Sequence, residues 1–181
     1  MGLALQNRGS ILFDDPSPSY RRLREHYAGK PVIFLDMDGV LCTPRAAVAT
    51  RDSGLIRALD PLGIAFLNRL CEDTGAVYVV SSTWRKEIEV PLLLQAAGVR
   101  GDCHVDWRTD EHGPRRGDEI QRWLDAHPDV TNFVILDDDT DFLESQKARH
   151  VKTDVTNGMM LEHYESARNI LTLGPRRQPA G

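Results

Sequence analysis

The chain has 181 residues, of which 41% are hydrophobic and 27% charged, and its formal net charge is −5. This length suits one well-buried domain and is too short for two ordinary ones. The mildly acidic balance gives no electrostatic footprint for nucleic-acid binding by the protein as a whole. No apolar stretch is long enough to cross a membrane. We interpret the local arginine clusters at 21–24, 115–116 and 176–177 as solvated surface features.

The cysteines and the first residues bear on the cellular compartment. Cys42, Cys71 and Cys103 are odd in number and widely spaced, and no pair has the spacing of metal ligands. We interpret them as free thiols in a reducing cytosol. The first residues lack the long apolar core of a signal peptide, and Gln6 stands where a myristoylation motif has Ser or Thr. The prediction is a cytoplasmic protein without membrane association.

The chain divides into a polar N-terminal segment, a region of alternating elements and a short tail. Residues 1–30 are expected to form a helical extension, with one helix over 17–28 that a residue within 15–17 caps. Residues 174–181 are rich in Gly, Pro and Arg and are predicted to be disordered. The remaining segment, 31–173, is predicted to be the one folded domain.

Short apolar runs in this domain are typical of buried parallel strands, and longer stretches with one apolar face are typical of helices. Strands are predicted at 31–35, 76–80, 101–106, 132–136 and 150–153. Helices are predicted at 61–73, 83–97 with a break at Pro91, 118–127, 141–148 and 159–172. Strands that alternate with helices imply crossover connections and a mostly parallel sheet, in which ligands bind beyond the carboxyl ends of the strands.

Two helices carry specific predictions about their ends and buried faces. Asp60 and Pro61 make a favourable start for the helix 61–73, and Gly75 can end it. The predicted buried face of that helix is made by Leu62, Phe66 and Leu70. The last helix is predicted to line up Leu161, Tyr164, Arg168 and Leu171.

Two acidic clusters directly follow predicted strands. The strand 31–35 leads into Asp36, Asp38 and Gly39, and alternate residues of an extended segment face the same way, so the two carboxylates are predicted to converge. The strand 132–136 leads into the run 137–139, followed by Asp141. Carboxylates this close repel one another unless a cation binds, and magnesium prefers oxygen ligands. The two clusters therefore predict a magnesium site.

Hydroxyl and guanidinium groups follow at two further places. Ser81 and Ser82 end the strand 76–80, where a hydroxyl can hydrogen-bond a phosphate oxygen or simply cap the next helix. Arg115 and Arg116 precede the helix 118–127, where a cation can bind phosphate or steady a carboxylate. The alternative for either arginine is an ordinary surface position.

These four pieces, in this order, resemble the haloacid dehalogenase-like (HAD) hydrolase superfamily. Its first motif appears here as DMDGVL after VIFL, its second as VYVVSS, and its paired-acid motif as FVILDDD. Its third motif usually has Lys, where this chain offers Arg116, and Arg is bulkier and keeps its proton. The segments SSTWR, RRGDEIQRWL and VILDDDTDF resemble domains of bacterial and phage RNA-repair proteins. The implied fold is a three-layer Rossmann-like α/β domain with a parallel sheet in the strand order 3-2-1-4-5.

The resemblance also implies a two-step phosphatase reaction. Asp36 attacks phosphorus and forms an aspartyl-phosphate, while Asp38 protonates the leaving oxygen and then activates water. A second Asp at this place is absent from the dehalogenases of the superfamily, so Asp38 favours a phosphatase or phosphotransferase. The implied phosphate-binding residues are Ser81, Ser82 and Arg116. The implied magnesium ligands are Asp36, Asp38 through its carbonyl, Asp138 and Asp137, with Asp141 able to hold a metal-bound water.

The segments 42–59 and 82–116 are too short for the full cap domain that many members of this superfamily carry. An open site can admit a small phosphorylated molecule or a nucleic-acid end, and the segment 42–59 can serve as a partial lid. The sequence does not determine whether the protein forms oligomers. The alternatives to a hydrolase are a phosphotransferase and a binding module that keeps the fold without turnover. The acidic clusters also have an interpretation without function, in which the first is a turn and the second is a solvated loop.

Overall fold

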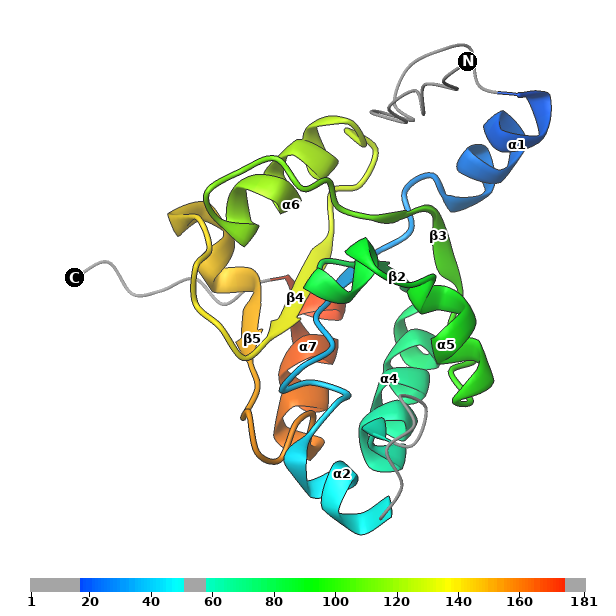
Figure 1. The fold of residues 1–181 in the computed structure, drawn as a ribbon. Coiled ribbons are helices and arrows are strands. Elements are labelled where there is room, and N and C mark those ends of the chain that lie inside the picture. Colours follow the sequence, from blue (N-terminus) through cyan, green and yellow to red (C-terminus); the bar gives the residue numbers. More distant parts are fainter. Residues whose placement is uncertain (1–16, 51–57, 175–181) are drawn as a thin grey trace, which may run out of the picture.

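The structure is a computed structural model that describes residues 17–50 and 58–174. Its centre is a five-stranded parallel sheet in the order β3-β2-β1-β4-β5 (Figure 1), which confirms the predicted fold class and strand order. The strands are β1 (Val32–Leu35), β2 (Val77–Val80), β3 (Cys103–Arg108), β4 (Phe133–Asp137) and β5 (His150–Lys152). Each lies within two residues of its predicted bounds at either end.

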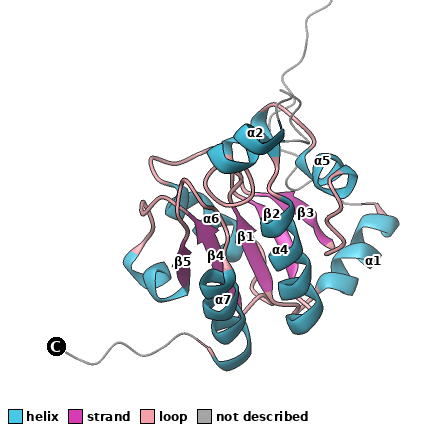
Figure 2. Cartoon of the chain, turned by 90° about the horizontal axis from the view of Figure 1, so that it is seen from below, coloured by secondary structure: helices cyan, strands magenta, loops and turns pink. Residues whose placement is uncertain are grey.

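Helices cover both faces of the sheet. Figure 2 shows α4 and α7 in front of the sheet and α6 behind it, so the three layers expected of this architecture are present. The helices are α1 (Pro18–Tyr27), α2 (Pro44–Thr50), α4 (Pro61–Thr74), α5 (Val90–Ala96), α6 (Arg116–Asp125) and α7 (Leu161–Leu173). Two 3-10 helices, η1 (Thr83–Lys86) and η2 (Glu144–Arg149), complete the connections. The predicted break near Pro91 separates η1 from α5.

The α4 helix begins and ends as its sequence predicts, but its buried face differs. The Asp60 carboxylate accepts a hydrogen bond from the backbone N–H of Leu62, and Gly75 ends the helix in the left-handed conformation. Leu62 was expected to be buried but is 42% exposed, because the core-facing stripe is shifted to positions that include Ile64 and Leu67.

The predicted face of α7 needs a similar correction. Leu161 is 55% exposed and Arg168 is also exposed, whereas Ala167 and Leu171 are the buried residues. The contact that orients this helix is with α4, where the Phe66 ring stacks on Tyr164. Leu171 and Tyr164 therefore lie on the covered face as expected, whereas Leu161 and Arg168 do not.

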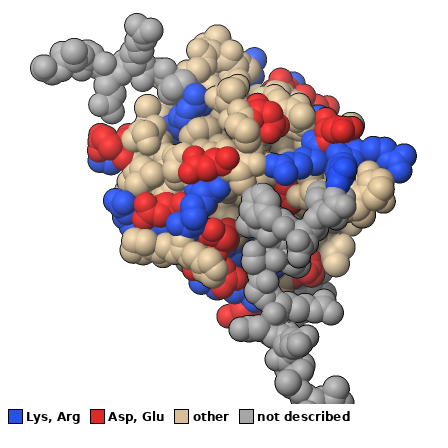
Figure 3. Space-filling view, turned by 90° about the horizontal axis from the view of Figure 1, so that it is seen from above, with Lys and Arg blue, Asp and Glu red and all other residues tan. Residues whose placement is uncertain are grey.

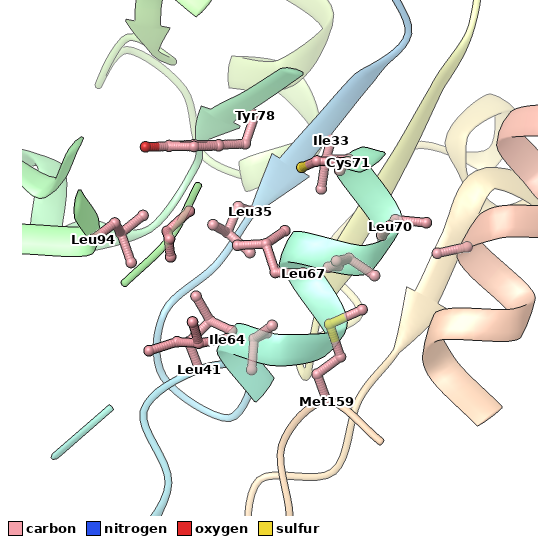
Figure 4. Packing of buried hydrophobic residues seen from close by; sticks show 14 of the residues in the cluster. Ile33, Leu35, Leu41, Ile64, Leu67, Leu70, Cys71, Tyr78, Leu94 and Met159 are labelled. Atoms are coloured by element: carbon pink, nitrogen blue, oxygen red, sulfur yellow. The ribbon is translucent and has the colours of Figure 1, made fainter. Parts of the chain in front are cut away.

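The strands are apolar throughout because both of their faces are buried. Alternate residues of β1 serve the two sides: Ile33 and Leu35 join the core beneath α4, α5 and α7, and Val32 and Phe34 join the core beneath α6. In Figure 4, Leu67 of α4 lies close to Leu35. On the other side, the edge of the Phe34 ring meets Trp123 of α6.

The ends of the chain and one internal segment limit what can be compared with the sequence predictions. Helix α1 confirms the predicted N-terminal helix, with the Ser17 hydroxyl accepting from the Tyr20 N–H. The predicted disordered tail lies outside the described residues apart from Gly174. The segment predicted as a loop at 42–59 contains α2, and its residues 51–57 are outside the described part.

The surface carries both signs of charge. On the face in Figure 3, acidic and basic side chains are interspersed over most of the surface, with one larger basic group toward the right edge. Within the described ranges, no helix combines the length and the apolar composition that a membrane span requires. Neither observation alters the sequence-based expectations about partners.

Candidate active site at the carboxyl edge of the sheet

The register of the sheet brings three predicted site residues to the same level. Leu35 of β1 is paired with Val80 of β2 and with Leu136 of β4. The next residue on each strand is Asp36, Ser81 or Asp137. Adjacent strands lie about 4.8 Å apart, so these three positions are neighbours at the carboxyl edge. Asp36, Ser81 and Asp137 each lie two residues after a strand residue that packs beneath α6, namely Phe34, Val79 or Ile135. Because side chains alternate along a strand, the three site residues also point to the α6 side of the sheet.

The two acidic clusters meet at this edge. Asp36, Asp137 and Asp138 each offer a carboxylate oxygen, and these oxygens all lie within 4.8 Å of one another. Asp36 is 5% exposed and Asp137 is fully buried. A cation is the usual remedy for carboxylates so close together, and an all-oxygen donor set suits magnesium. The residues present therefore fit the metal that the sequence predicts.

Gly39 makes the close approach of the two clusters possible. Its φ is +66°, a left-handed conformation in which the chain turns away after the strand β1. A Cβ atom at this position would lie 2.5 Å from Cγ of Asp138. Only glycine therefore allows Asp138 to pack over the turn that follows Asp36.

Arg116 supplies the positive charge in this acidic cluster. Its Nη1 donates to Oδ1 of Asp36 at 2.6 Å and lies 3.1 Å from Oδ2 of Asp137. The second contact is an ion pair without an aligned hydrogen bond, because that Asp137 oxygen has no hydrogen-bond partner among the described residues. Arg115 is exposed and pairs with Asp118 instead. Of the two arginines, only Arg116 contacts the cluster.

The start of α6 holds Arg116 in place. The Asp141 carboxylate accepts from the Arg116 backbone N–H at 3.0 Å, and the Asp141 carbonyl accepts from the N–H of Gly117. A Cβ atom on Gly117 would come within 2.6 Å of the backbone nitrogen of Leu143, so glycine lets α6 approach the segment after β4. Asp141 thus caps the helix with one oxygen, and its other oxygen has no partner in the described chain.

One guanidinium does not neutralise three carboxylates, and the electrostatics reflect this. Burial, and after it the charge of Asp36, raises the pKa of Asp137. The same two causes raise the pKa of Asp138. Burial opposes the charged form of Arg116, yet Asp36 and Asp137 raise its pKa above the usual range. The cluster is therefore short of positive charge as it stands.

Asp38 takes a different position from the one its spacing suggests. Its side chain is exposed, and its carboxylate is not part of the three-residue cluster. Instead, Oδ2 of Asp38 accepts a hydrogen bond of 2.8 Å from the indole Nε1 of Trp84. Asp36 and Asp38 thus leave the turn toward different partners, which corrects the expectation that their carboxylates converge.

The two serines after β2 differ in their bonding. The Ser82 hydroxyl accepts from the backbone N–H of Trp84 and caps η1, which is the plain role considered for it. The Ser81 hydroxyl is fully buried and has no hydrogen-bond partner among residues 17–50 and 58–174. An orphaned hydroxyl next to Asp36 is free to bond an incoming oxygen.

A buried arginine beneath this loop was not foreseen in the sequence. Arg85, in the segment SSTWR, is 2% exposed. Its guanidinium donates to the carbonyl oxygens of Ser81 and Ser82 and pairs with Glu119 of α6 at 2.8 Å. It also donates to the carbonyl oxygens of residues 109 and 110. The side chain therefore fixes the loop after β2 from inside. The local sequence gives no signal for such a role, because the partners come from three separate segments.

Comparison with known proteins agrees with this geometry. The family model described as the HAD domain in Swiss Army Knife RNA repair proteins matches residues 32–164. The matched segment contains all five strands, the three clustered aspartates and Arg116. It confirms both the superfamily resemblance and the narrower resemblance to RNA-repair proteins. Neither the curated proteins nor the solved structures gave a match to this chain.

Proposed function

Because this chain belongs to the family of HAD domains in Swiss Army Knife RNA repair proteins, we propose that it is a magnesium-dependent phosphomonoester hydrolase. The family membership itself establishes a HAD hydrolase-like domain. The metal, the covalent intermediate on Asp36 and the choice of substrate are the parts that we add. A cytoplasmic location remains the expectation from the sequence.

The observation that carries the proposal is the excess of negative charge at the sheet edge. Three carboxylates share one guanidinium, and Asp137 and Asp138 both have raised pKa values. Asp36, Asp137 and Asp138 would hold the magnesium ion, together with the backbone carbonyl of Asp38. When bound, magnesium neutralises phosphoryl oxygens so that an anionic nucleophile can approach them.

The residues of the chain have separate tasks in the proposed reaction. The Asp36 carboxylate attacks phosphorus, and Asp38 gives a proton to the leaving oxygen and later takes one from the attacking water. Arg116 orients Asp36 through the 2.6 Å hydrogen bond and stabilises charge on the transferred group. The unpartnered Ser81 hydroxyl would bond a phosphoryl oxygen. Asp141 keeps Arg116 in place by capping α6.

The proposed substrate is a phosphomonoester on a nucleotide or a nucleic-acid end. The connections after β1 and β2 are too short for a full cap domain, so the site stays open to a large substrate. The description of the matched family, RNA repair, points the same way. The screen should therefore compare nucleotides, sugar phosphates and oligonucleotides phosphorylated at the 3′ or the 5′ end.

The deciding experiment measures phosphate release with and without magnesium in wild type and Asp36→Asn. We expect magnesium-dependent turnover that the substitution lowers by at least about 10³-fold, since it removes the nucleophile. Asp125→Asn is the matched control, because Asp125 is an exposed aspartate whose carboxylate accepts a hydrogen bond from Gln121 on the same helix. Absence of turnover across the panel in wild type would favour the binding module. Transfer of phosphate to an acceptor other than labelled water would favour the phosphotransferase.

A further inference from the structure

The Asp38 carboxylate accepts a hydrogen bond from a donor that lies outside the superfamily motifs quoted above. The Trp84 indole Nε1 donates to its Oδ2 at 2.8 Å. Asp38 itself is exposed.

The fold holds the donor and the acceptor on short, well-bonded segments. Asp38 lies in the turn after β1, which Cys42 closes, because its N–H donates to the carbonyl of Met37 at 2.7 Å and its carbonyl accepts from the N–H of Gly39. Trp84 belongs to η1, which begins right after β2 and is capped by Ser82. The two groups thus follow the two strands whose ends form the site.

An exposed aspartate needs such support if it is to deliver a proton in one direction. A free carboxylate on the surface samples several rotamers, and only some of them face a leaving oxygen. The hydrogen bond from Trp84 restricts the orientation of the Asp38 side chain. It also keeps this side chain out of the three-carboxylate cluster, where a fourth negative charge would add repulsion.

We propose that Trp84 is a positioning residue that holds the Asp38 carboxyl group in line with the leaving oxygen. The inference rests on the proposed function, in which the bond from phosphorus to the leaving oxygen breaks as the bond to Asp36 forms. In that step the Asp38 proton moves to the leaving oxygen. In the second step water bonds to phosphorus, its proton returns to Asp38, and the bond to Asp36 breaks.

Leaving groups of different basicity separate positioning of the acid from general damage to the site. An alkyl leaving oxygen needs a proton in the transition state, whereas the phenolate of p-nitrophenyl phosphate leaves without one. We expect Trp84→Phe, which removes the N–H and keeps an aromatic ring, to lower kcat about tenfold on an alkyl phosphomonoester. The loss on p-nitrophenyl phosphate should be less than about twofold.

A matched control addresses the cavity that Trp84 also lines. This cavity of about 340 Å³ is bounded by Thr83, Trp84, Glu87 and Ile88. Thr83→Ala alters the exposed wall of the cavity without touching the indole donor, so it should leave the ratio of the two rates unchanged. In an Asp38→Asn background, Trp84→Phe should have no further effect, because the group that it positions is gone.

The outcomes distinguish the positioning role from the proposed function. Equal losses on both substrates, or no loss on either, in Trp84→Phe would overturn the positioning role while the hydrolase stands. A full additional loss from Trp84→Phe in the Asp38→Asn background would overturn it as well. Absence of turnover by wild type on both substrates would remove the proposed function, and the positioning role with it. The ratio of the two rates within one variant guards against a folding defect, because unfolded protein lowers both rates equally.

Discussion

Two polar clusters in this molecule are built from similar groups but differ in how completely their atoms are bonded. The acidic cluster consists of Asp36, Asp137 and Asp138 with Arg116. A second cluster, which we call the histidine cluster, consists of His104, Asp106 and His127, on β3 and just after α6. In each cluster the three possible ligand atoms lie within 4.8 Å of one another. Proximity alone therefore does not distinguish them.

The histidine cluster satisfies its own hydrogen-bonding groups. The His127 ring bonds the Trp123 carbonyl through Nδ1 and the Asp106 carboxylate through Nε2. Both ring nitrogens of His127 therefore have an oxygen partner. The other Asp106 oxygen accepts from the Tyr20 hydroxyl of α1, and His104 Nδ1 accepts from the Asp106 N–H. No lone pair in this arrangement needs a metal ion.

The acidic cluster lacks that balance. Asp137 keeps an oxygen with no hydrogen bond in the described chain, and its pKa is raised. In the histidine cluster, burial opposes ionisation of Asp106, yet hydrogen bonds from His127 and Tyr20 lower its pKa. The pKa of the carboxyl group is raised in the acidic cluster and lowered in the histidine cluster. The first cluster therefore lacks positive charge, whereas the second is a complete hydrogen-bond network that joins α1 to the domain. Each prediction below would break or sharpen this distinction.

The largest effect on stability is expected from removing the centre of the histidine cluster. His127→Ala deletes a buried ring that stacks on Trp123 at 3.7 Å between centroids and leaves Asp106 without its ion pair. Loss of one partner of a buried pair typically costs about 3 kcal/mol or more. We expect the free energy of unfolding in urea to fall by about this amount, while kcat per folded molecule stays unchanged.

His112→Ala is the control for this measurement. His112 is exposed, and its hydrogen bond to Asp110 uses the backbone N–H, so the substitution should change stability by less than about 0.5 kcal/mol. A large loss of kcat in folded His127→Ala would show that the two clusters do not have separate roles.

The next effect tests the geometry of the acidic cluster. Gly39→Ala places a Cβ in a left-handed conformation and 2.5 Å from Cγ of Asp138. The strain should cost about 2 kcal/mol in unfolding free energy. The displaced carboxylate should lower phosphatase kcat by about a hundredfold in the protein that remains folded.

Gly29→Ala is a useful comparison. Gly29 also has a positive φ, of +72°, but its Cβ would meet nothing within 4 Å. It should lose stability to a similar conformational cost without losing kcat. Equal activity of the two alanine variants would mean that the position of Asp138 does not matter to the chemistry.

Local sequence patterns predicted the strands, most helix ends and the acidic edge of the sheet. Four-residue apolar runs indicate buried strands because both faces are covered, and the residue after each run lies at the carboxyl edge whatever the details of packing. The cap at Asp60 and the stop at Gly75 depend only on adjacent backbone groups. Features that depend only on neighbouring residues can therefore be predicted from a single sequence.

Features that depend on contacts between distant segments could not be predicted from the sequence. The buried faces of α4 and α7 depend on how each helix rotates against its neighbour, so Leu62 and Leu161 were misplaced. The bond from Trp84 to Asp38 depends on the rotation of a side chain across the gap between two strand ends. The histidine cluster gave no signal in the sequence, because β3 and the residue after the end of α6 contribute to it and they are separate in the chain.

The smallest effect concerns the pH dependence of stability. Burial, followed by the charge of His127, lowers the pKa of His104 to about 4, from 6.5 for the free side chain. Asp106 opposes this shift, and Arg24 of α1 adds to it. Between these two pH values the unfolded chain binds a proton that the folded chain does not. The contribution of His104 to stability is therefore complete above pH 6.5 and is lost as the pH falls toward 4.

The matched variant for the pH test is His104→Asn, whose side-chain oxygen can still accept from the Asp106 N–H but does not titrate. Unfolding free energies in urea and EDTA should fall by about 1–2 kcal/mol more in wild type than in the variant between pH 6.5 and pH 5. Asp137 contributes with the opposite sign, because its raised pKa makes the folded state take up a proton first on acidification, and this term cancels in the difference. Parallel pH profiles would mean that His104 is not held neutral by its surroundings, and the histidine cluster would then lose the bonding pattern that sets it apart from the acidic one.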